Sequence, residues 1–366
     1  MAPEMTVIDL GQLHFPGAEK ELARHGALTA SIFRYPSGVA ALRLRNGAGV
    51  VTLLPYHGQQ IWDIEFLGRT LTMRSMFDAP VDTTDYLGNY GAFFLHCGAT
   101  AMGNPGPDDT HPLHGELPNA KYQTAALIIG EDEGGPFMGL TGSYHHKVAF
   151  TSHYVATPQL KLHAGATRIG MELTVRNLFH RPMDLMYLAH INFRPADGGI
   201  LLDTVPDSAQ HIRVRTKLPE FFTPAASHIQ LIAGLKAGPG RHRSIVAGRA
   251  IDPELVMGLD YRSGADGLAH SLQIHPDGSS DVVSHRPAEL PRAVRWMTRT
   301  ADQDAMGLAL PSTAEADGYT AEKAKGNVKS LAFGEEWRCR LSFGALDKAE
   351  TATLRQRIEA IRNVQP

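Results

Sequence analysis

The sequence predicts an all-β protein, a large antiparallel β-sandwich followed by a C-terminal helix. Three observations support this fold class: short segments in which apolar and polar residues alternate, many turn-forming residues, and few segments with helical periodicity. The chain of 366 residues contains 36 glycines and 23 prolines, an excess that many short strands joined by turns require. Because no repeat, linker or change in composition divides the chain, we expect residues 1–366 to form a single domain.

Alternation with a period of two is clearest in residues 62–66, 168–176 and 336–343, where apolar side chains occupy every second position. Such a segment forms a strand with one buried and one exposed face. Further strand-like runs, separated by glycine, proline, aspartate and asparagine, are residues 50–54, 122–129, 147–156, 184–192, 269–275, 293–297 and 327–333. Short strands at this spacing are typical of a large antiparallel sandwich.

Helical signals are confined to the two ends of the chain. Asp347 and Glu350 form a capping-box pattern ahead of apolar residues spaced by three and four, which predicts a helix over about residues 347–362. A short helical turn is expected over residues 18–23, before Gly26. Two long loops are expected, at residues 104–110 and 224–240.

Charge and composition exclude several classes of protein. The 35 basic and 38 acidic side chains give a net charge of −3, which argues against a dedicated nucleic-acid binder. The apolar content of 43% argues against disorder. No run approaches the roughly 18 apolar residues of a membrane span, and the first residues lack the layout of a signal peptide. We therefore expect a soluble, cytoplasmic protein that binds neither nucleic acid nor membranes.

The known motifs for nucleotide and serine chemistry are missing from the sequence. It contains no P-loop, no G-x-G-x-x-G after a predicted strand, no G-x-S-x-G and no C-x-x-C. Cys97 and Cys339 are too few to form a disulfide framework. A phosphate pocket would require clustered arginines, and only residues 241–243 (Arg-His-Arg) resemble one, with a solvated loop as the alternative.

Histidine is unusually frequent, with 18 in the chain, and it is the commonest proton-transfer residue and metal ligand. The densest polar cluster is residues 111–119. In an extended segment, His114 and Glu116 would point to the same face. They would then pair a proton carrier with a carboxylate, or supply two of the three ligands that a metal needs. The alternative is a polar loop that hydrogen-bonds its own backbone.

His190 is the second candidate, near the end of the strand expected over residues 184–192. Its neighbours on the same strand face are apolar, so burial should lower its pKa and keep the imidazole neutral near pH 7. A neutral imidazole can donate a hydrogen bond, shuttle a proton or bind a metal. The alternative is a core histidine whose hydrogen bonds are satisfied.

The order of these motifs resembles the aldose 1-epimerase (galactose mutarotase-like) superfamily, and in particular a branch of it catalogued as a domain of unknown function. Residues 113–115 are similar to the family's L-H-G motif, residues 189–193 to its N-H-x-x-F strand, and residues 331–335 to its L-x-P-G-E turn. The motifs extend over about residues 45–346. The resemblance implies a supersandwich of antiparallel strands with a sugar-binding groove on its concave face.

The resemblance also implies roles for individual residues. In mutarotases of this superfamily, the histidine that matches His190 is the general acid, the one that matches His114 assists at the substrate, and a glutamate on a late strand is the general base. This sequence has Leu310 before Pro311, where that glutamate is expected. Because leucine cannot accept a proton, we hypothesise that Glu116 supplies the missing carboxylate.

The resulting hypothesis is a carbohydrate epimerase or isomerase that acts on a free aldose or ketose. His114, Glu116 and His190 would be the catalytic residues, and Arg74 and Asn192 would bind the sugar. A divalent metal ion such as Mn, Zn or Mg on the three catalytic residues is a variant of this hypothesis. Further ligands for that ion could come from His57, His96 or His145.

Several alternatives stay open on the sequence. A non-catalytic sugar-binding or sugar-sensing protein would explain the loss of the family glutamate. A standard aldose 1-epimerase and a lyase or hydrolase that uses the same groove are further options, since a fold does not fix a function. The partner in each case is a small-molecule sugar. The identity of the sugar, the carbon that reacts and the oligomeric state are left open.

Overall fold

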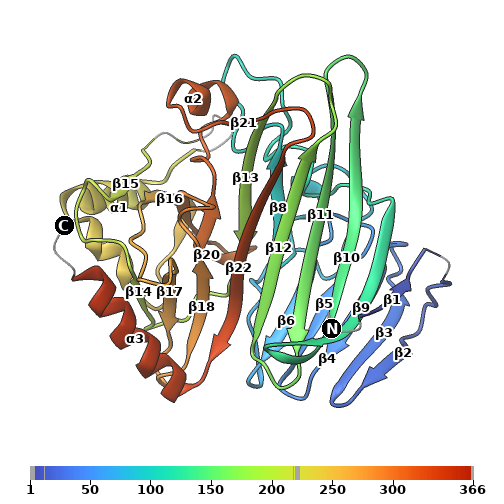
Figure 1. Ribbon diagram of the computed structural model, residues 1–366. Helices are drawn as coiled ribbons and strands as arrows, with labels where there is room; N and C mark the ends of the chain where they lie inside the picture. The colour runs from blue at the N-terminus through green and yellow to red at the C-terminus, as the bar shows by residue number, and fades with distance from the viewer. Residues whose placement is uncertain (1–4, 12, 217, 219–222, 364–366) are drawn as a thin grey trace.

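Two large antiparallel sheets make up most of the molecule (Figure 1). The computed structural model describes residues 5–11, 13–216, 218 and 223–363. The smaller sheet has nine strands, in the order β1 (Thr6–Asp9), β9 (Thr124–Asp132), β10 (Gly135–Val148), β11 (Ser152–His163), β12 (Arg168–Asn177), β22 (Glu336–Leu346), β18 (Ser280–His285), β17 (Ala269–Ile274) and β14 (Ile200–Asp203). The prediction of a large antiparallel β-sandwich is confirmed.

The larger sheet has 13 strands and carries the candidate site. Its order is β15 (Ile212–Val214), β16 (Ile251–Leu259), β19 (Arg292–Arg299), β20 (Asp304–Ser312), β13 (Met183–Ile191), β8 (Phe94–Ala99), β6 (Ile61–Phe66), β5 (Gly49–Leu53), β4 (Ala40–Arg45), β3 (Leu28–Arg34) and β2 (Lys20–His25). Two short strands lie off this path: β21 (Lys329–Leu331) pairs with β13, and β7 (Arg69–Thr70) pairs with β6.

Apolar residues at alternating positions fix the register of the strands, because a slip by one residue would turn the buried face towards solvent. In β12 and β22, which are neighbours, Leu173 pairs with Cys339 and Val175 with Trp337. These two predicted strands therefore share one buried face. The core lies between the sheets, where Phe94 of β8 stacks on Phe343 of β22 at a centroid distance of 5.2 Å.

Helices cover the edges of the sandwich. The described helices are α1 (Ala226–Ala237), α2 (Tyr319–Ala324), α3 (Lys348–Arg362) and the 3₁₀ helices η1 (Leu87–Asn89) and η2 (Pro239–Arg243). The predicted C-terminal helix is confirmed as α3, with Asp347 and Glu350 forming the capping box. Ile358 of α3 packs against β17 and β18 through Leu272 and Val282. None of the helices among the described residues is long and apolar enough to cross a membrane.

Three local predictions were wrong. Residues 18–23 were expected to be helical, but they lead into strand β2, which pairs with β3 across a turn at Gly26 (φ +59°). Residues 224–240 were expected to be a loop, but they form α1 and the start of η2. Residues 147–156 were expected to be one strand, but they contain the turn between β10 and β11. Local periodicity is weak in all three, so pairing and packing decided the structure.

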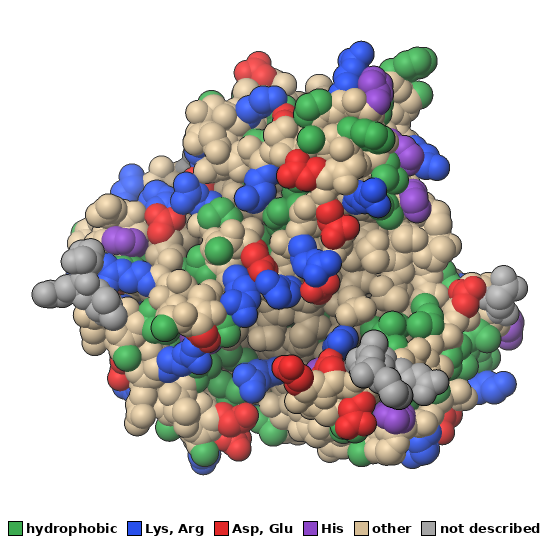
Figure 2. All heavy atoms as spheres, viewed as in Figure 1, with side chains coloured by type: hydrophobic (Ala, Val, Ile, Leu, Met, Phe, Trp, Pro, Cys, Tyr) green, Lys and Arg blue, Asp and Glu red, His purple; other side chains and the backbone are tan. Residues whose placement is uncertain are grey.

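The surface is mixed in charge. Figure 2 shows acidic and basic side chains interspersed over one face, with apolar side chains scattered between them. This agrees with the nearly even numbers of basic and acidic residues.

Several histidines are buried and neutral. Burial lowers the pKa of six of them to about 3 or about 4: His57, His96, His190, His242, His270 and His285. In the unfolded chain each would titrate near pH 6.5, so the unfolded state binds more protons as the pH falls below that value. For each pH unit that the pH falls below 6.5, each of these histidines therefore lowers the free energy of unfolding by up to about 1.4 kcal/mol.

We therefore expect the free energy of unfolding to fall by several kcal/mol between pH 7 and pH 5. Urea unfolding at half-unit pH intervals measures this slope. A His285→Gln variant, which removes one of these six buried histidines, should make the slope shallower. A flat profile over this range would show that the histidines can be protonated without opening the fold.

Candidate functional site

A cavity of about 370 Å³ opens on the face of the larger sheet that points away from the sandwich core. The alternation along β13 shows this orientation. Tyr187 packs on Trp337 of the smaller sheet, whereas Leu188 and His190 line the cavity. Other walls come from β16, β19 and the segments around η1 and residue 114, with Tyr86, Tyr90, His114, Arg215, Glu254 and Trp296 among the lining residues.

His114 and His190 meet in this cavity. Their ring centroids lie 5.5 Å apart, with the ring planes nearly perpendicular at 87°. The sequence places the two residues 76 positions apart, and the structure confirms that they converge. Among the described residues, neither Nδ1 atom has a hydrogen-bond partner although both atoms are buried. Neither nitrogen is therefore committed to a partner in the described part of the chain.

Burial keeps both imidazoles neutral. It lowers the pKa of His190 to about 4. It lowers the pKa of His114 well below its ordinary value, and the neighbouring His190 lowers it further. At neutral pH each ring therefore offers one N–H donor and one acceptor nitrogen. The pair can polarise a substrate oxygen or relay a proton.

Aromatic rings enclose the histidine pair. Tyr86 lies 4.9 Å from the His114 ring, and Trp296 lies 5.6 Å from the His190 ring. The Tyr90 ring contacts both His190 and Trp296, at 5.8 and 5.9 Å. Apolar walls with a few polar groups are typical of small-molecule sites. The flat rings also suit the apolar faces of a sugar.

A strained turn places His114. Its φ of +60° is unusual for a residue with a side chain. Gly115 follows with a φ of +80°, and a Cβ atom there would lie 2.3 Å from the Ala101 carbonyl oxygen and 2.5 Å from that of Gly98. The turn is held by hydrogen bonds from the Gly98 amide to the His114 carbonyl and from the His114 amide to the Gly103 carbonyl.

Gly115→Ala is expected to destabilise the protein by about 2–4 kcal/mol, because the new methyl group meets two backbone oxygens and the backbone is strained. Gly165→Ala is the matched control, since its φ is +69° but nothing lies within 4 Å of its Cβ position. Urea unfolding of both variants separates the clash from the strain. Equal losses in the two variants would contradict this account of the turn.

The Glu116 side chain lies outside the cavity, which corrects the expectation that it points to the same face as His114. Because His114 and Gly115 both have positive φ, the segment turns instead of running extended. The Glu116 carboxylate accepts hydrogen bonds from the amides of Ala99 and Thr100 and from the hydroxyls of Thr100 and Tyr154. It does not line the cavity. Its contacts tie the His114 turn to β8 and β11.

Arg74 and Asn192, the residues expected to bind the sugar, instead hydrogen-bond to the backbone of segments next to the cavity. Arg74 donates to the carbonyls of Thr300 and Ala301, and so fixes the segment that brings Thr300 to the cavity wall. Asn192 is fully buried and donates to the Ala92 carbonyl. Neither side chain lines the cavity. Leu310 does line it, so the position where the resemblance places a glutamate faces the site.

The described residues do not bring His114, Glu116 and His190 together as a metal site. Within them, the side chains whose ligand atoms lie within 4.8 Å of one another are Glu315, Asp317 and Glu322, far along the chain. The Lys325 ammonium bonds all three of these carboxylates, at 2.7–2.9 Å. His57 and His96 bond to other buried side chains, and His145 is exposed. The donor set at the cavity therefore does not fit the predicted ion.

Glu254 on β16 is a cavity residue that the sequence analysis missed. Burial raises the pKa of its carboxyl group, while a hydrogen bond from Trp296 and the charge of Arg215 act in the opposite direction. The Trp296 Nε1–H donates to Glu254 Oε2 over 2.7 Å. A signal was present in the sequence, since Glu254 is an acidic residue between the apolar residues Pro253 and Leu255. That segment was not recognised as a strand.

The two sheets form a galactose mutarotase-like β-sandwich. The chain belongs to the family described as a domain of unknown function (DUF4432), whose model matches residues 36–345. This confirms the branch of the superfamily that the sequence motifs indicated. A comparison with curated proteins gave no match.

Solved structures show the same fold at low sequence identity. A protein from Klebsiella pneumoniae named "putative aldose 1-epimerase" has a TM-score of 0.83 and 16% identity, with 99% of this chain and 97% of that chain covered. A galactose mutarotase-like protein from Clostridium acetobutylicum has a TM-score of 0.57 and 14% identity, with coverages of 91% and 99%. A second protein named "putative aldose 1-epimerase", from Escherichia coli K12, has a TM-score of 0.53 and 13% identity, with coverages of 93% and 99%.

Proposed function

We propose that the protein is a carbohydrate epimerase or isomerase that acts on a free sugar in the 370 Å³ cavity. The observation that supports this most is the combination of two neutral imidazoles with Glu254 in one aromatic-walled cavity. Epimerisation requires one group that removes a proton and another that donates one or stabilises charge. The names of the similar solved structures point to the same class of reaction.

In this proposal Glu254 replaces Glu116 as the carboxylate. A raised pKa makes a carboxylate a stronger base than a solvated glutamate. Trp296 fixes one of its oxygens and leaves the other for the substrate. A glutamate on β16 thereby compensates for the absence of a glutamate at position 310. The neighbouring strand β19 carries Trp296, which donates to that glutamate.

Two reactions fit this arrangement. In ring opening, Glu254 takes the proton of the anomeric hydroxyl as a C=O bond forms and the bond to the ring oxygen breaks, and an imidazole N–H gives the ring oxygen its proton. In epimerisation beside a carbonyl, Glu254 takes the proton from carbon and an imidazole N–H stabilises the oxygen of the enediolate. An imidazole N–H then delivers a proton to the opposite face of the same carbon, Glu254 loses its proton to solvent and the imidazole regains one from solvent, which completes the second reaction. Neither reaction changes the oxidation state overall.

Proton NMR of a panel of free aldoses and ketoses in deuterated water tests the proposal. Faster exchange between anomers without incorporation of deuterium at carbon indicates ring opening. A new epimer or isomer with deuterium at the reacting carbon indicates proton removal from carbon. Sugar binding with no acceleration of either reaction would refute the enzyme and leave the non-catalytic sugar-binding alternative, which the leucine at position 310 favours.

A further inference from the structure

A second cavity, of about 410 Å³, lies behind the candidate active site. The two cavities share strands β16 and β19 but use opposite faces. Leu255 and Met297 line the second cavity, while their neighbours Glu254 and Trp296 line the first. Adjacent residues of a strand point to opposite faces, so the two cavities are separated by the thickness of one sheet.

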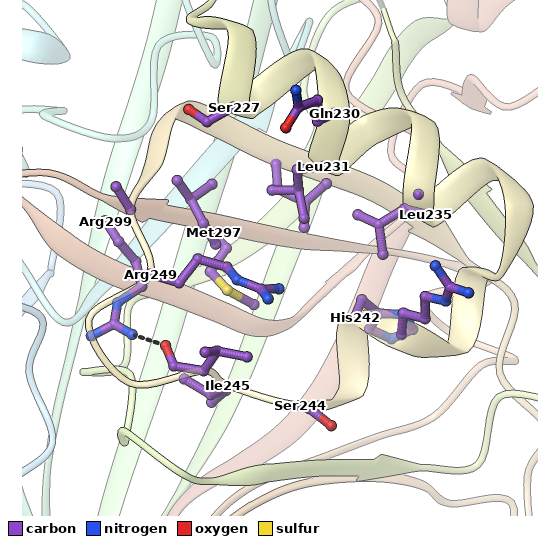
Figure 3. Close-up of a pocket in the computed structure, with 16 residues that line it drawn as sticks. Ser227, Gln230, Leu231, Leu235, His242, Ser244, Ile245, Arg249, Met297 and Arg299 are labelled. Atoms are coloured by element: carbon purple, nitrogen blue, oxygen red, sulfur yellow. Dashed lines mark hydrogen bonds between the residues drawn. The ribbon is translucent and has the colours of Figure 1, made fainter.

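Helix α1 and the 3₁₀ helix η2 cover the second cavity. Figure 3 shows Leu231 and Leu235 of α1 pointing towards Met297 of β19, with Ile245 on the other side. These side chains form an apolar interior. Polar groups lie around it, and they come from Ser227, Gln230, Arg241, Ser244, Arg249 and Arg299.

The polar groups are strongly cationic. Among the described residues that line the cavity, Arg241, Arg249 and Arg299 carry positive charge and no aspartate or glutamate is present. Arg299 is paired with Asp197 and Asp304. Within the described part of the chain, Arg241 and Arg249 form no ion pair within 4.0 Å. Both side chains are exposed, so each can turn towards a ligand. Figure 3 shows Arg249 extending across the cavity beside Met297.

A buried network of ion pairs lies beside the cavity and fixes its wall. His242 lines the cavity, and its Nε2 atom accepts a hydrogen bond from Arg295 over 2.7 Å. Arg295 and Arg243 share the buried carboxylate of Asp203, at 3.0 and 2.6 Å. Arg243 also pairs with the half-exposed Asp207. The two guanidinium groups are therefore matched by the carboxylates of Asp203 and Asp207, and the cations left for an anion in the cavity are Arg241 and Arg249.

We propose that this second cavity binds a small amphiphilic anion, a molecule with an apolar body and a single carboxylate or phosphate group. The apolar body occupies the space between α1 and the β16–β19 pair, and the anionic group pairs with Arg249 and Arg241. The volume falls in the range of about 300–1,000 Å³ that is typical of small-molecule sites. The cluster at residues 241–243 thus belongs partly to a ligand site and partly to a buried ion network, rather than to a solvated loop.

Four probes test the chemistry on the full-length protein by isothermal titration calorimetry and thermal shift. Octanoate and octyl phosphate carry both features, octanol lacks the charge, and acetate lacks the apolar body. We expect octanoate or octyl phosphate to bind at least tenfold more tightly than octanol and acetate. The comparison of octanoate with octyl phosphate shows which anionic group is preferred. Equal affinity for octanol and octanoate would refute an anion site.

Three variants test the location. Arg249→Gln should weaken binding of the preferred probe at least tenfold, because a charge-assisted hydrogen bond is lost. Leu231→Trp should block binding by filling the apolar interior without a change in charge. Arg215→Gln removes the arginine of the other cavity and should leave the affinity unchanged. If Arg215→Gln abolishes binding while Arg249→Gln does not, the probe occupies the first cavity and the proposal is wrong.

Circular dichroism and urea unfolding establish that each variant is folded before binding is measured. Arg249 is exposed, and Leu231 borders the open cavity and is only partly buried, so both changes should leave the fold intact. Arg249→Lys provides a further check, since it keeps the charge and should restore part of the affinity that Arg249→Gln loses. A lysine variant as weak as the glutamine variant would contradict a role for charge at this position.

Discussion

Glu254→Gln is expected to lower kcat by at least about 100-fold on whichever sugar the protein converts, because the amide keeps the size of the side chain but cannot accept a proton. The hydrogen bond from Trp296 can still be accepted by the amide oxygen, so the cavity should keep its shape and substrate affinity should change little. Steady-state kinetics with the substrate identified by NMR measures both parameters.

The pH profile gives a second readout for Glu254. Because burial raises the pKa of its carboxyl group, activity should rise with pH through an inflection above the ordinary range of glutamate, near 4.3. The inflection should be lost in Glu254→Gln. Burial lowers the pKa of His190 to about 4 and lowers that of His114 as well, so neither ring should contribute a second inflection between pH 6 and 8.

Glu116→Gln is the comparison that decides between the two carboxylates. Glu116 holds the His114 turn through the Thr100 and Tyr154 hydroxyls, so its replacement should lower the melting temperature more than it lowers kcat. If Glu116→Gln abolishes turnover in a folded protein while Glu254→Gln does not, the assignment of the base is reversed.

His190→Phe is expected to lower kcat by roughly 100- to 10,000-fold, the usual contribution of a group that donates or accepts a proton in the transition state. Phenylalanine fills the space beside Trp296 and Tyr90, and burial of an apolar ring at this site costs no unpaired nitrogen. The variant should therefore be at least as stable to urea as the parent protein. A loss of stability parallel to the loss of activity would indicate a structural role.

The double variant His114→Phe/His190→Phe tests whether the two imidazoles act as a unit. Their rings lie 5.5 Å apart, close enough for strong coupling. We expect the double variant to be scarcely slower than the slower single variant, because removal of one member already disables a shared proton relay. Multiplicative losses would show that the two histidines act independently.

The strands with clear alternation were predicted correctly because their pattern has only one physical solution. In β12 and β22, every second residue is apolar, and only a strand with one buried face separates these residues from the polar ones between them. The capping box of α3 is equally local, since Asp347 and Glu350 satisfy each other's backbone amides. Residues 18–23 and 224–240 lack such a pattern, and contacts with distant segments decided their structure.

The site was predicted in part for a related reason. His114 was identified from the polar cluster at residues 111–119 and His190 from its place near the end of a predicted strand, and each also belongs to a motif that resembles a known family. Glu116 was assigned from an extended backbone that the structure does not have, since two successive positive φ values turn the segment. Glu254 was missed because its segment was not recognised as a strand, and because its position beside the histidines depends on the pairing of β16 with β19.

The sequence by itself determined the all-β architecture, the C-terminal helix and the two histidines, because alternation, capping and short motifs act over a few residues. Tertiary structure decided which carboxylates share the cavity with these histidines, namely Asp252, Glu254 and Asp302, and it alone revealed the cationic cavity behind β16 and β19. Both results depend on which face of a strand meets which distant segment. That is set by the burial of the whole core, which no single stretch of sequence contains.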